Sequence, residues 1–421
     1  MEMILEFLRD ILSQPALLIG IMSCVGLIAL KRPFHKIMTG TLKPILGYLM
    51  LAAGAGVIVS NLDPLGKMIE HGFHITGVVP NNEAIVAVAQ KVLGVETMSI
   101  LVVGLLMNLL IARFTKFKYV FLTGHHSLFM ACLMSAVLGT AGLSGIELIL
   151  VGGFLMGAWS AISPAIGQSY TSKVTDGDEI ALGHFGSLGY YLSAWVAKYV
   201  GKAEESTEDI EIPEKWGFLR DSTLSTALTM IVFYLIAAIA AGSEFVATLS
   251  GSMSPYLFAI MSAMNFAVGV AIVYSGVRMI LGDLIPAFQG IATKIIPNAI
   301  PAVDCAVFFT YAPTAVVLGF ISSFIGGIIG MLILGAVGGV LIIPGLVPHF
   351  FCGATAGIYG NATGGRRGAA VGAFLNGLAI TFLPALALPV LGQLGFQNTT
   401  FGDADFAVMG LVLGNAFEWI G

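Results

Sequence analysis

The sequence predicts an all-α polytopic membrane protein of about eleven transmembrane helices, with an inverted repeat and two re-entrant hairpins. The 421 residues are 57% hydrophobic and only 10% charged, and their mean hydropathy of +0.93 is far above that of soluble domains. Apolar runs long enough to cross about 30 Å of hydrocarbon follow one another along the chain. A short motif, an apolar pair followed by Pro-Asn, occurs once in each half.

The apolar runs set the predicted spans. Before them, Ile4, Phe7, Leu8 and Ile11 recur at helical spacing, which predicts an amphipathic helix at the membrane interface. The spans are expected near residues 15–30, 45–62, 97–113, 119–140, 145–167, 223–248, 255–282, 316–340, 341–361, 368–393 and 403–421.

The distribution of basic residues predicts the orientation. If the segment between the first two spans is cytoplasmic, 16 of the 19 Lys and Arg residues lie inside, and only Arg9, Lys67 and Lys91 lie outside. This is the asymmetry of the positive-inside rule. The long polar segment 168–222 is then a cytoplasmic loop. Its residues Leu188, Tyr191, Leu192 and Trp195 predict a helix that lies at the interface.

The repeated motif reads VVPN at residues 78–81 and IIPN at 295–298. In the predicted orientation the two copies lie on opposite membrane faces. An isolated loop with an ordinary turn explains one copy, but a surface loop gives no reason for an inverted second one. Paired proline-interrupted segments of this kind indicate a transporter with a site near the membrane midplane.

The predicted organisation follows from this repeat. We expect a first repeat at 1–167 with a re-entrant hairpin at 64–96, and the cytoplasmic loop at 168–222. A second repeat at 223–393 contains a hairpin at 284–304, and a final helix occupies 394–421.

Ionisable residues in apolar surroundings are the candidate site residues, because they are costly inside a membrane. Asp304, between apolar neighbours, is the strongest candidate, although an acid there can also cap a helix. His125 and His126 follow. Adjacent helical residues point about 100° apart, so His125 is favoured, with a hydrogen-bonded packing role as the alternative. Asn82 and Glu83 mark the first hairpin.

Several functions receive no support. The four cysteines show no CxxC spacing, so neither a metal site nor a disulfide framework is predicted. A net charge of -5 without a basic tract does not indicate nucleic-acid binding. No phosphate-binding loop is present in the sequence, and no cofactor is expected.

An ordered set of short motifs carries a family resemblance. LTGH, VTDG followed by GH, KAEESTEDI, GVRM, AFQGI and AVDCA together resemble the membrane component, enzyme IIC, of the L-ascorbate family of the phosphotransferase system. The resemblance covers the chain from residue 15 onwards. It implies a homodimer in the bacterial inner membrane, built of eleven segments. These form a V-shaped dimerisation domain and a core that moves in elevator fashion, interleaved along the chain.

The resemblance also implies a substrate and partners. The substrate is L-ascorbate or a related sugar acid, phosphorylated during uptake by a separate enzyme IIB with a phosphocysteine, which enzyme IIA supplies. This chain is then the transport component and not itself the phosphoryl-transfer enzyme. The implied site comprises Asn82, Glu83, His125, His126, Ser127, Leu128, Phe129, His184, Phe185 and Asp304.

Four of these positions depart from the family pattern, which has glutamine at Phe129 and Phe185 and Thr-Tyr at Asn82 and Glu83. The rival hypothesis is a secondary transporter coupled to ions or protons, in which Asp304, Glu83 and the histidines relay protons. The residues alone leave both open.

Overall fold

The computed structural model describes residues 11, 14–74, 77–80, 82–177, 179–210, 222–392 and 399–418. It is mostly helical, and each of the eleven predicted spans overlaps a helix. Among the described residues, six helices are long and apolar enough to cross a membrane, or seven if one bent pair is a single span. The predicted interfacial helix at the N-terminus lies outside the described residues, apart from Ile11.

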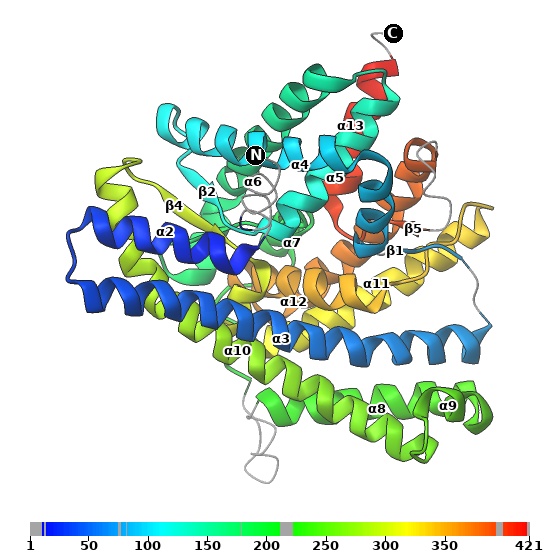
Figure 1. Ribbon diagram of the computed structural model, residues 1–421. Helices are drawn as coiled ribbons and strands as arrows, with labels where there is room; N and C mark the ends of the chain where they lie inside the picture. The colour runs from blue at the N-terminus through cyan, green and yellow to red at the C-terminus, as the bar shows by residue number, and fades with distance from the viewer. Residues whose placement is uncertain are drawn as a thin grey trace.

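One group of helices forms a long layer (Figure 1). It contains α2 (Pro15–Ala29), α3 (Phe34–Phe73), α8 (Ser222–Ala241), α9 (Ser243–Ser250) and α10 (Pro255–Lys294), which pack mainly against one another. Helices α3 and α10 have 40 residues each. At 1.5 Å per residue each is about 60 Å long, twice the hydrocarbon thickness, so both must tilt strongly or project from the membrane.

The second group lies above this layer in Figure 1. It consists of α4 (Asn82–Phe114), α5 (Gly124–Thr140), α6 (Gly145–Thr175), α7 (Ser187–Val200), the 3-10 helix η2 (Cys305–Thr310), α11 (Pro313–Ala336), α12 (Leu346–Gly392) and α13 (Ala404–Glu418). Helix α12 is broken at Gly364 and Gly365, whose backbone angles are not helical. Its two halves correspond to the predicted spans 341–361 and 368–393.

Short parallel strands hold the second group together. Strand β4 (Ile300–Val303) lies between β2 (Tyr119–Phe121) and β3 (Ala181–Leu182). Strand β1 (Val79–Pro80) pairs with β5 (Thr399–Thr400), and the neighbouring Val78 forms a bridge with Ile342. Strand β4 follows the 40-residue helix α10 and is bonded to two earlier segments of the chain. The segment 78–80 follows the 40-residue helix α3 and is bonded to two later ones. The residues that follow these strands lie close together and form the polar part of the site described below.

The two segments predicted as re-entrant hairpins contain the ends of long helices. The chain from 284 to 304 is the end of α10 followed by β4, and from 64 to 96 it is the end of α3, then β1, then the start of α4. Neither is a separate pair of short helices, because the long helices continue into both segments. Pro80 lies within β1, whereas Pro297 precedes β4, so the two Pro-Asn motifs occupy different positions relative to the strands.

The segment 168–222 was also predicted too simply as a cytoplasmic loop with an interfacial helix. Helix α6 continues to Thr175, and α7 packs against α12, where Ser193 Oγ donates to the Ala356 carbonyl at 2.6 Å. Of the predicted lipid-facing residues, Tyr191 is buried, whereas Trp195 is 51% exposed. Small residues on the opposite face of α7 allow the close packing that the sequence pattern did not indicate.

The predicted span 223–248 is bent. Helices α8 and α9 meet at 117°, and Gly242 at the bend has φ of +81°, which favours glycine. This segment is therefore not one straight crossing.

Glycines set the close crossing of α3 and α10. A Cβ on Gly54 would lie 2.7 Å from the Gly269 carbonyl oxygen, and one on Gly47 would lie 2.8 Å from the Gly276 carbonyl oxygen. The reciprocal contacts, from Gly269 to Gly54 and from Gly276 to Gly47, are equally short. The two backbones therefore touch, as at the small-residue interfaces of membrane helices.

Gly54→Ala should destabilise this crossing by about 1–3 kcal/mol, because the methyl group meets backbone that cannot yield without separating the helices. Gly56→Ala is the matched control on the same helix, since no atom lies within 4 Å of its Cβ position. It should be neutral or stabilising by up to about 1 kcal/mol. Thermal unfolding of the purified variants compares them, and equal melting temperatures would contradict the packing described.

Candidate functional site

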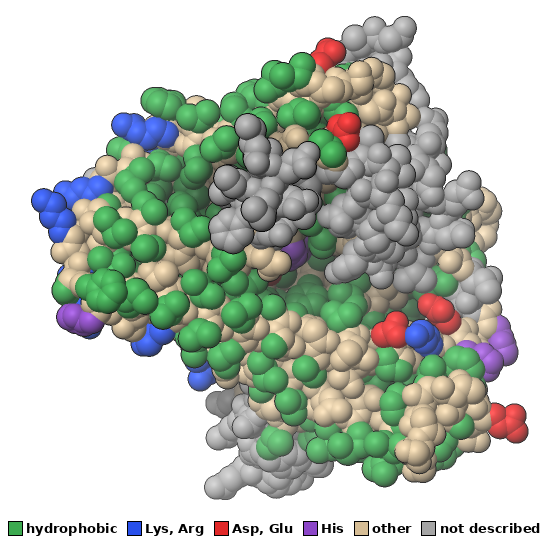
Figure 2. All heavy atoms as spheres, in the orientation of Figure 1, with side chains coloured by type: hydrophobic (Ala, Val, Ile, Leu, Met, Phe, Trp, Pro, Cys, Tyr) green, Lys and Arg blue, Asp and Glu red, His purple; other side chains and the backbone are tan. Residues whose placement is uncertain are grey.

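A cavity of about 1180 Å³ lies between the two groups of helices, and Figure 2 shows the hollow, with histidine purple visible inside it. Its walls are mostly apolar side chains of α3, α8, α11 and α12. Six polar residues cluster at one place, where the strands of both clusters end: Asn82, His125, His126, His184, Asp304 and Asp403. Four other polar residues of the lining, Gln14, Asp63, Lys67 and Glu70, stand apart from this cluster in the sequence. A large apolar cavity with few convergent polar groups is the usual form of a small-molecule site.

Asp304 and His125 form the first part of this site. Asp304 follows β4 directly and is 7% exposed, while His125 lies in the first turn of α5 after β2. The His125 Nε2 atom lies 3.3 Å from Asp304 Oδ2, and its Nδ1 atom lies 3.1 Å from the Tyr48 hydroxyl. Asp304 Oδ1 accepts from the Ala306 backbone N–H at 3.1 Å. The acid thus caps η2, as the alternative interpretation expected, and also lines the cavity.

His126 and His184 form the second part. Both line the cavity, and their ring centroids are 3.8 Å apart. The Nδ1 atom of His126 accepts from the Phe185 backbone N–H at 3.3 Å, and that of His184 accepts from the Gly186 N–H at 3.1 Å. An accepting nitrogen carries no proton, so each neutral ring has its proton on Nε2. The site therefore offers two imidazole N–H donors.

This arrangement bears on metal binding. Two groups bring ligand atoms within 4.8 Å of one another: His126, His184 and Asp403, and His184, Asp304 and Cys305. A metal-bound histidine almost always donates its other ring N–H to an acceptor. The Nδ1 atoms of His126 and His184 accept instead. The hydrogen bonds therefore suit an oxygen-rich ligand better than a cation.

Asp403 lies beside His184, where β5 ends. Its Oδ2 atom accepts from the Asn82 side-chain amide at 2.5 Å, and its Oδ1 atom accepts from the Cys352 thiol at 2.8 Å. Asn82 Oδ1 in turn accepts from the Gly402 backbone N–H at 2.8 Å. The separation of Asp403 Oδ1 from His184 Nδ1 is 3.9 Å, too long for a hydrogen bond. Asp403 joins α4, α12 and α13 at the cavity wall.

Asp405 positions the segment that carries His184. It is fully buried and accepts from the Ser187 hydroxyl at 2.7 Å, the Leu188 backbone N–H at 2.9 Å and the Trp159 indole N–H at 3.2 Å. Its own N–H donates to the Phe185 carbonyl at 3.0 Å. Asp405 does not line the cavity. Its role is to tie the start of α7 to α13.

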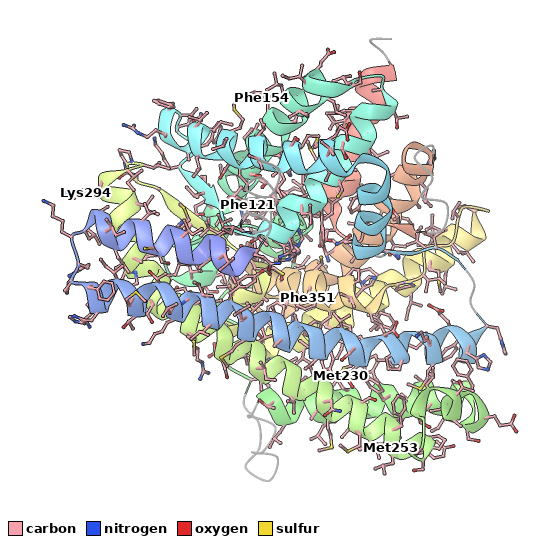
Figure 3. The ribbon with its side chains drawn as sticks, viewed as in Figure 1. Phe121, Phe154, Met230, Met253, Lys294 and Phe351 are labelled. Carbon is pink, nitrogen blue, oxygen red and sulfur yellow. The ribbon has the colours of Figure 1, made fainter. Side chains whose placement is uncertain are left out.

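Aromatic rings form the layer behind the histidines. Phe185 stacks on Phe121, labelled in Figure 3, with centroids 4.6 Å apart. Phe406 stacks on His126 at 5.7 Å and contacts Phe129 at 6.3 Å. Phe129 and Phe185 also lie against the His126 ring, with centroids 5.7 and 6.0 Å away, so the histidines rest on an aromatic wall.

The structure divides the ten predicted site residues. Six line the cavity: Asn82, His125, His126, Phe129, His184 and Asp304. Both histidines of the HH pair face it, although only His125 was favoured. Ser127, Leu128 and Phe185 do not line it, since Ser127 donates to the Thr123 carbonyl and the other two pack in an apolar cluster. The side chain of Glu83 lies outside the described residues.

Sequence reasoning missed Tyr48, Asp403 and Asp405. The two acids stand in the apolar stretch FGDADFAV, and the rule that selected Asp304 applies equally to them. Both lie at the start of the predicted span 403–421, but they are not among the predicted site residues. Nothing in the sequence marks Tyr48 as a site residue, because a tyrosine in an apolar helix is most often a packing residue.

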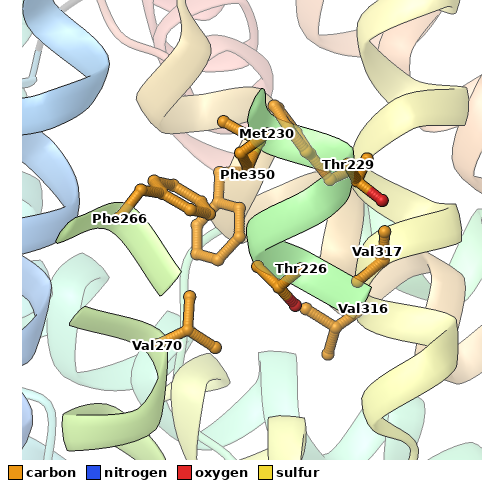
Figure 4. A pocket seen from close by; sticks show the side chains of 9 residues that line it. Thr226, Thr229, Met230, Phe266, Val270, Val316, Val317 and Phe350 are labelled. Atoms are coloured by element: carbon orange, nitrogen blue, oxygen red, sulfur yellow. The ribbon is translucent and has the colours of Figure 1, made fainter. Parts of the chain in front are cut away.

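A second, small pocket is not a site. Figure 4 shows its lining, which is entirely uncharged and includes Thr226, Met230, Phe266 and Phe350. Its volume of about 10 Å³ is at most that of one water molecule.

The long apolar helices and the polar site in a cavity between two helix groups define a polytopic membrane transport protein. Residues 10–405 match the family model EIIC-GAT, described as the PTS system sugar-specific permease component. The chain therefore belongs to this permease family, which confirms the family expected from the motifs. It is a multi-pass protein of the inner membrane.

A curated relative bears on the substrate. The "Ascorbate-specific PTS system EIIC component" of Mycoplasma pneumoniae (strain ATCC 29342 / M129 / Subtype 1) is 26% identical over 417 residues, which cover 85% of this chain and 62% of the relative. The chain thus matches less than two thirds of the relative's length.

Proposed function

We propose that this chain binds L-ascorbate, or a closely related sugar acid, and moves it into the cytoplasm as enzyme IIC of a phosphotransferase system. The observation that carries this proposal is the placement of imidazole donors and carboxylate acceptors at one point of the cavity. The Nε2–H groups of His126 and His184 suit the anionic enediolate oxygens of such a ligand, and Asp304 suits its hydroxyl groups. The name of the relative supports ascorbate over other sugar acids.

Phosphoryl transfer belongs to a partner in this proposal. Enzyme IIB, with a phosphocysteine recharged by enzyme IIA, phosphorylates the ligand on the cytoplasmic side. Exposed basic residues support this orientation. Lys31 and Arg32 lie between α2 and α3, and Lys36 lies in the first turn of α3; all three are exposed. Figure 2 shows blue side chains gathered at the end of the molecule where Figure 1 places the connection between these two helices. A cysteine at exposed position 204, in the predicted cytoplasmic segment, should resist an impermeant thiol reagent in intact cells. Its labelling there would reverse the orientation.

The ion pair of His125 with Asp304 also fits a different transporter, one coupled to protons. The two functions differ in product. Intact cells that express this chain with its enzyme IIB should accumulate phosphorylated ascorbate, and uptake should stop without the phosphoryl donor. Unmodified ascorbate accumulated under a pH or sodium gradient would instead establish the secondary transporter.

Transport is proposed to proceed by an elevator movement of the second helix group against the first, which fits the location of the cavity between them. In each half a 40-residue helix is followed by a short strand that pairs in parallel with a distant segment, and this order supports an inverted repeat behind the movement. Leu257, Met261, Met264 and Val268 form an exposed apolar stripe on α10, which suits a homodimer of V-shaped domains. The mass of the purified protein in detergent tests the dimer.

Locking the two groups together should abolish transport and leave ligand binding intact. A Cβ on Gly66 of α3 would lie 3.8 Å from Leu346 Cδ1, the end of a side chain of α12, so the thiols of Gly66→Cys and Leu346→Cys can be joined by a short, cleavable bis-thiol reagent. Cross-linking of this pair in a background without the native cysteines should stop uptake, and cleavage of the cross-link should restore it. The single Gly66→Cys variant is the control. Wild-type uptake by fully cross-linked protein would contradict the movement.

A further inference from the structure

We infer that Asp403 is a second ligand-contacting carboxylate, which accepts a hydrogen bond from a hydroxyl group of the substrate and helps to set specificity. The inference rests on the proposed function, since it concerns the same site. It adds a residue to that site that neither the motifs nor the relative's name points to.

Location is the first argument. Asp403 is 4% exposed, yet it lines the large cavity. One of its oxygens lies within 4.8 Å of nitrogens of His126 and His184, and Asp304 lies equally close to His184 from β4. The two carboxylates therefore flank His184. A ligand that reaches the imidazole N–H groups also meets both acids.

Unused hydrogen-bonding capacity is the second argument. An ionised carboxylate has about four acceptor positions. Among the described residues, Asp403 receives only the Asn82 amide and the Cys352 thiol, and a thiol is a weak donor. Asp405, two residues away, receives three donors and does not line the cavity. The contrast separates a positioning acid from one with acceptor positions left for a ligand.

Charge gives the ligand its orientation. A sugar-acid anion placed with its charged oxygens toward Asp304 and Asp403 would be repelled at close range in a site of low dielectric constant. Its charged oxygens therefore face the Nε2–H donors of His126 and His184. The hydroxyl groups remain for the carboxylates, one group for each acid. Asp403 thus selects ligands with a hydroxyl at one particular carbon.

The test measures binding by calorimetry on purified full-length protein with L-ascorbate and three analogues, which lack or mask the hydroxyl at C2, C5 or C6. Asp403→Asn should weaken ascorbate binding about tenfold to a hundredfold, because the amide replaces one acceptor oxygen with a donor. For one analogue, wild type and Asp403→Asn should bind alike, since the contacted hydroxyl is already gone. Asp209→Asn, at an exposed position that does not line the cavity, is the matched control and should bind all four ligands as wild type does.

Equal weakening for all four ligands would show that Asp403 only holds Asn82 and Cys352 in place, and would overturn the inference. Unchanged affinity for ascorbate would overturn it too. If wild type binds no ascorbate, the proposed substrate fails together with the inference, which distinguishes that case from the first two. Should Asp403→Asn not fold, Asp403→Glu moves the carboxylate by one methylene. Asp403→Glu must then weaken the binding only of those ligands that keep the hydroxyl group contacted by Asp403.

Discussion

Asp304→Ala should lower the affinity for L-ascorbate by about tenfold to more than a hundredfold, which corresponds to about 1–3 kcal/mol for an unpaired buried ligand group. The carboxylate is 7% exposed and stands at the end of β4, where it pairs with His125 across the site. Removing it leaves both the ligand hydroxyl and the Nε2 atom of His125 without a partner. Calorimetry on monodisperse protein measures the loss.

Asp304→Asn separates the roles of this residue. The amide oxygen can still accept from the Ala306 N–H and so keep the cap of η2. It can also accept from a ligand hydroxyl, so the loss of affinity should be partial. His125→Ala should match Asp304→Ala in affinity without lowering the melting temperature, because it caps no helix. Wild-type affinity in both alanine variants would remove these residues from the ligand site.

Asp405→Ala should have the largest effect on stability, about 3–5 kcal/mol. Three buried donors, on Ser187, Leu188 and Trp159, lose their common acceptor, and removing one partner of a buried charged network costs this much. Helix α7 then loses its attachment to α13, and His184 moves with it. We expect a strongly lowered melting temperature and little binding in the fraction that folds.

Trp159→Phe provides the graded comparison, because it removes one of the three donors and leaves a smaller aromatic ring. Its effect should be smaller, about 1 kcal/mol. Asp209→Asn is again the exposed control. If Asp405→Ala unfolds at the wild-type temperature, Asp405 does not hold α7 as described.

Composition and apolar run length were sufficient to predict the helical membrane class, because hydrocarbon thickness constrains every span in the same way. They could not predict where helices end beyond the apolar run. Helix α3 continues to Phe73 and α10 to Lys294, and their ends make up much of what was predicted as hairpins. Amphipathic pattern alone likewise placed α7 at the interface, whereas its small residues pack on α12.

The site was predictable in part, one acid or histidine at a time. Asp304 and His125 stood out as ionisable residues in apolar surroundings. They lie next to His184 because β2, β4 and β3, which come from distant parts of the chain, pair with one another. Strands of two to four residues are too short to be predicted from the sequence pattern. The same holds for Asn82 and Asp403, whose side chains meet across 321 positions. An acid at the end of a predicted span should count as a candidate site residue in the same way as an acid in its middle.

The central claim is that ascorbate binds in the part of the cavity that Asp304, His125 and His184 line. The most direct measurement is an experimental structure of the full-length protein with L-ascorbate. We predict ligand density in contact with Asp304 and with the Nε2 atoms of His126 and His184. Ascorbate bound elsewhere, with only water beside Asp304, His125 and His184, would contradict the account.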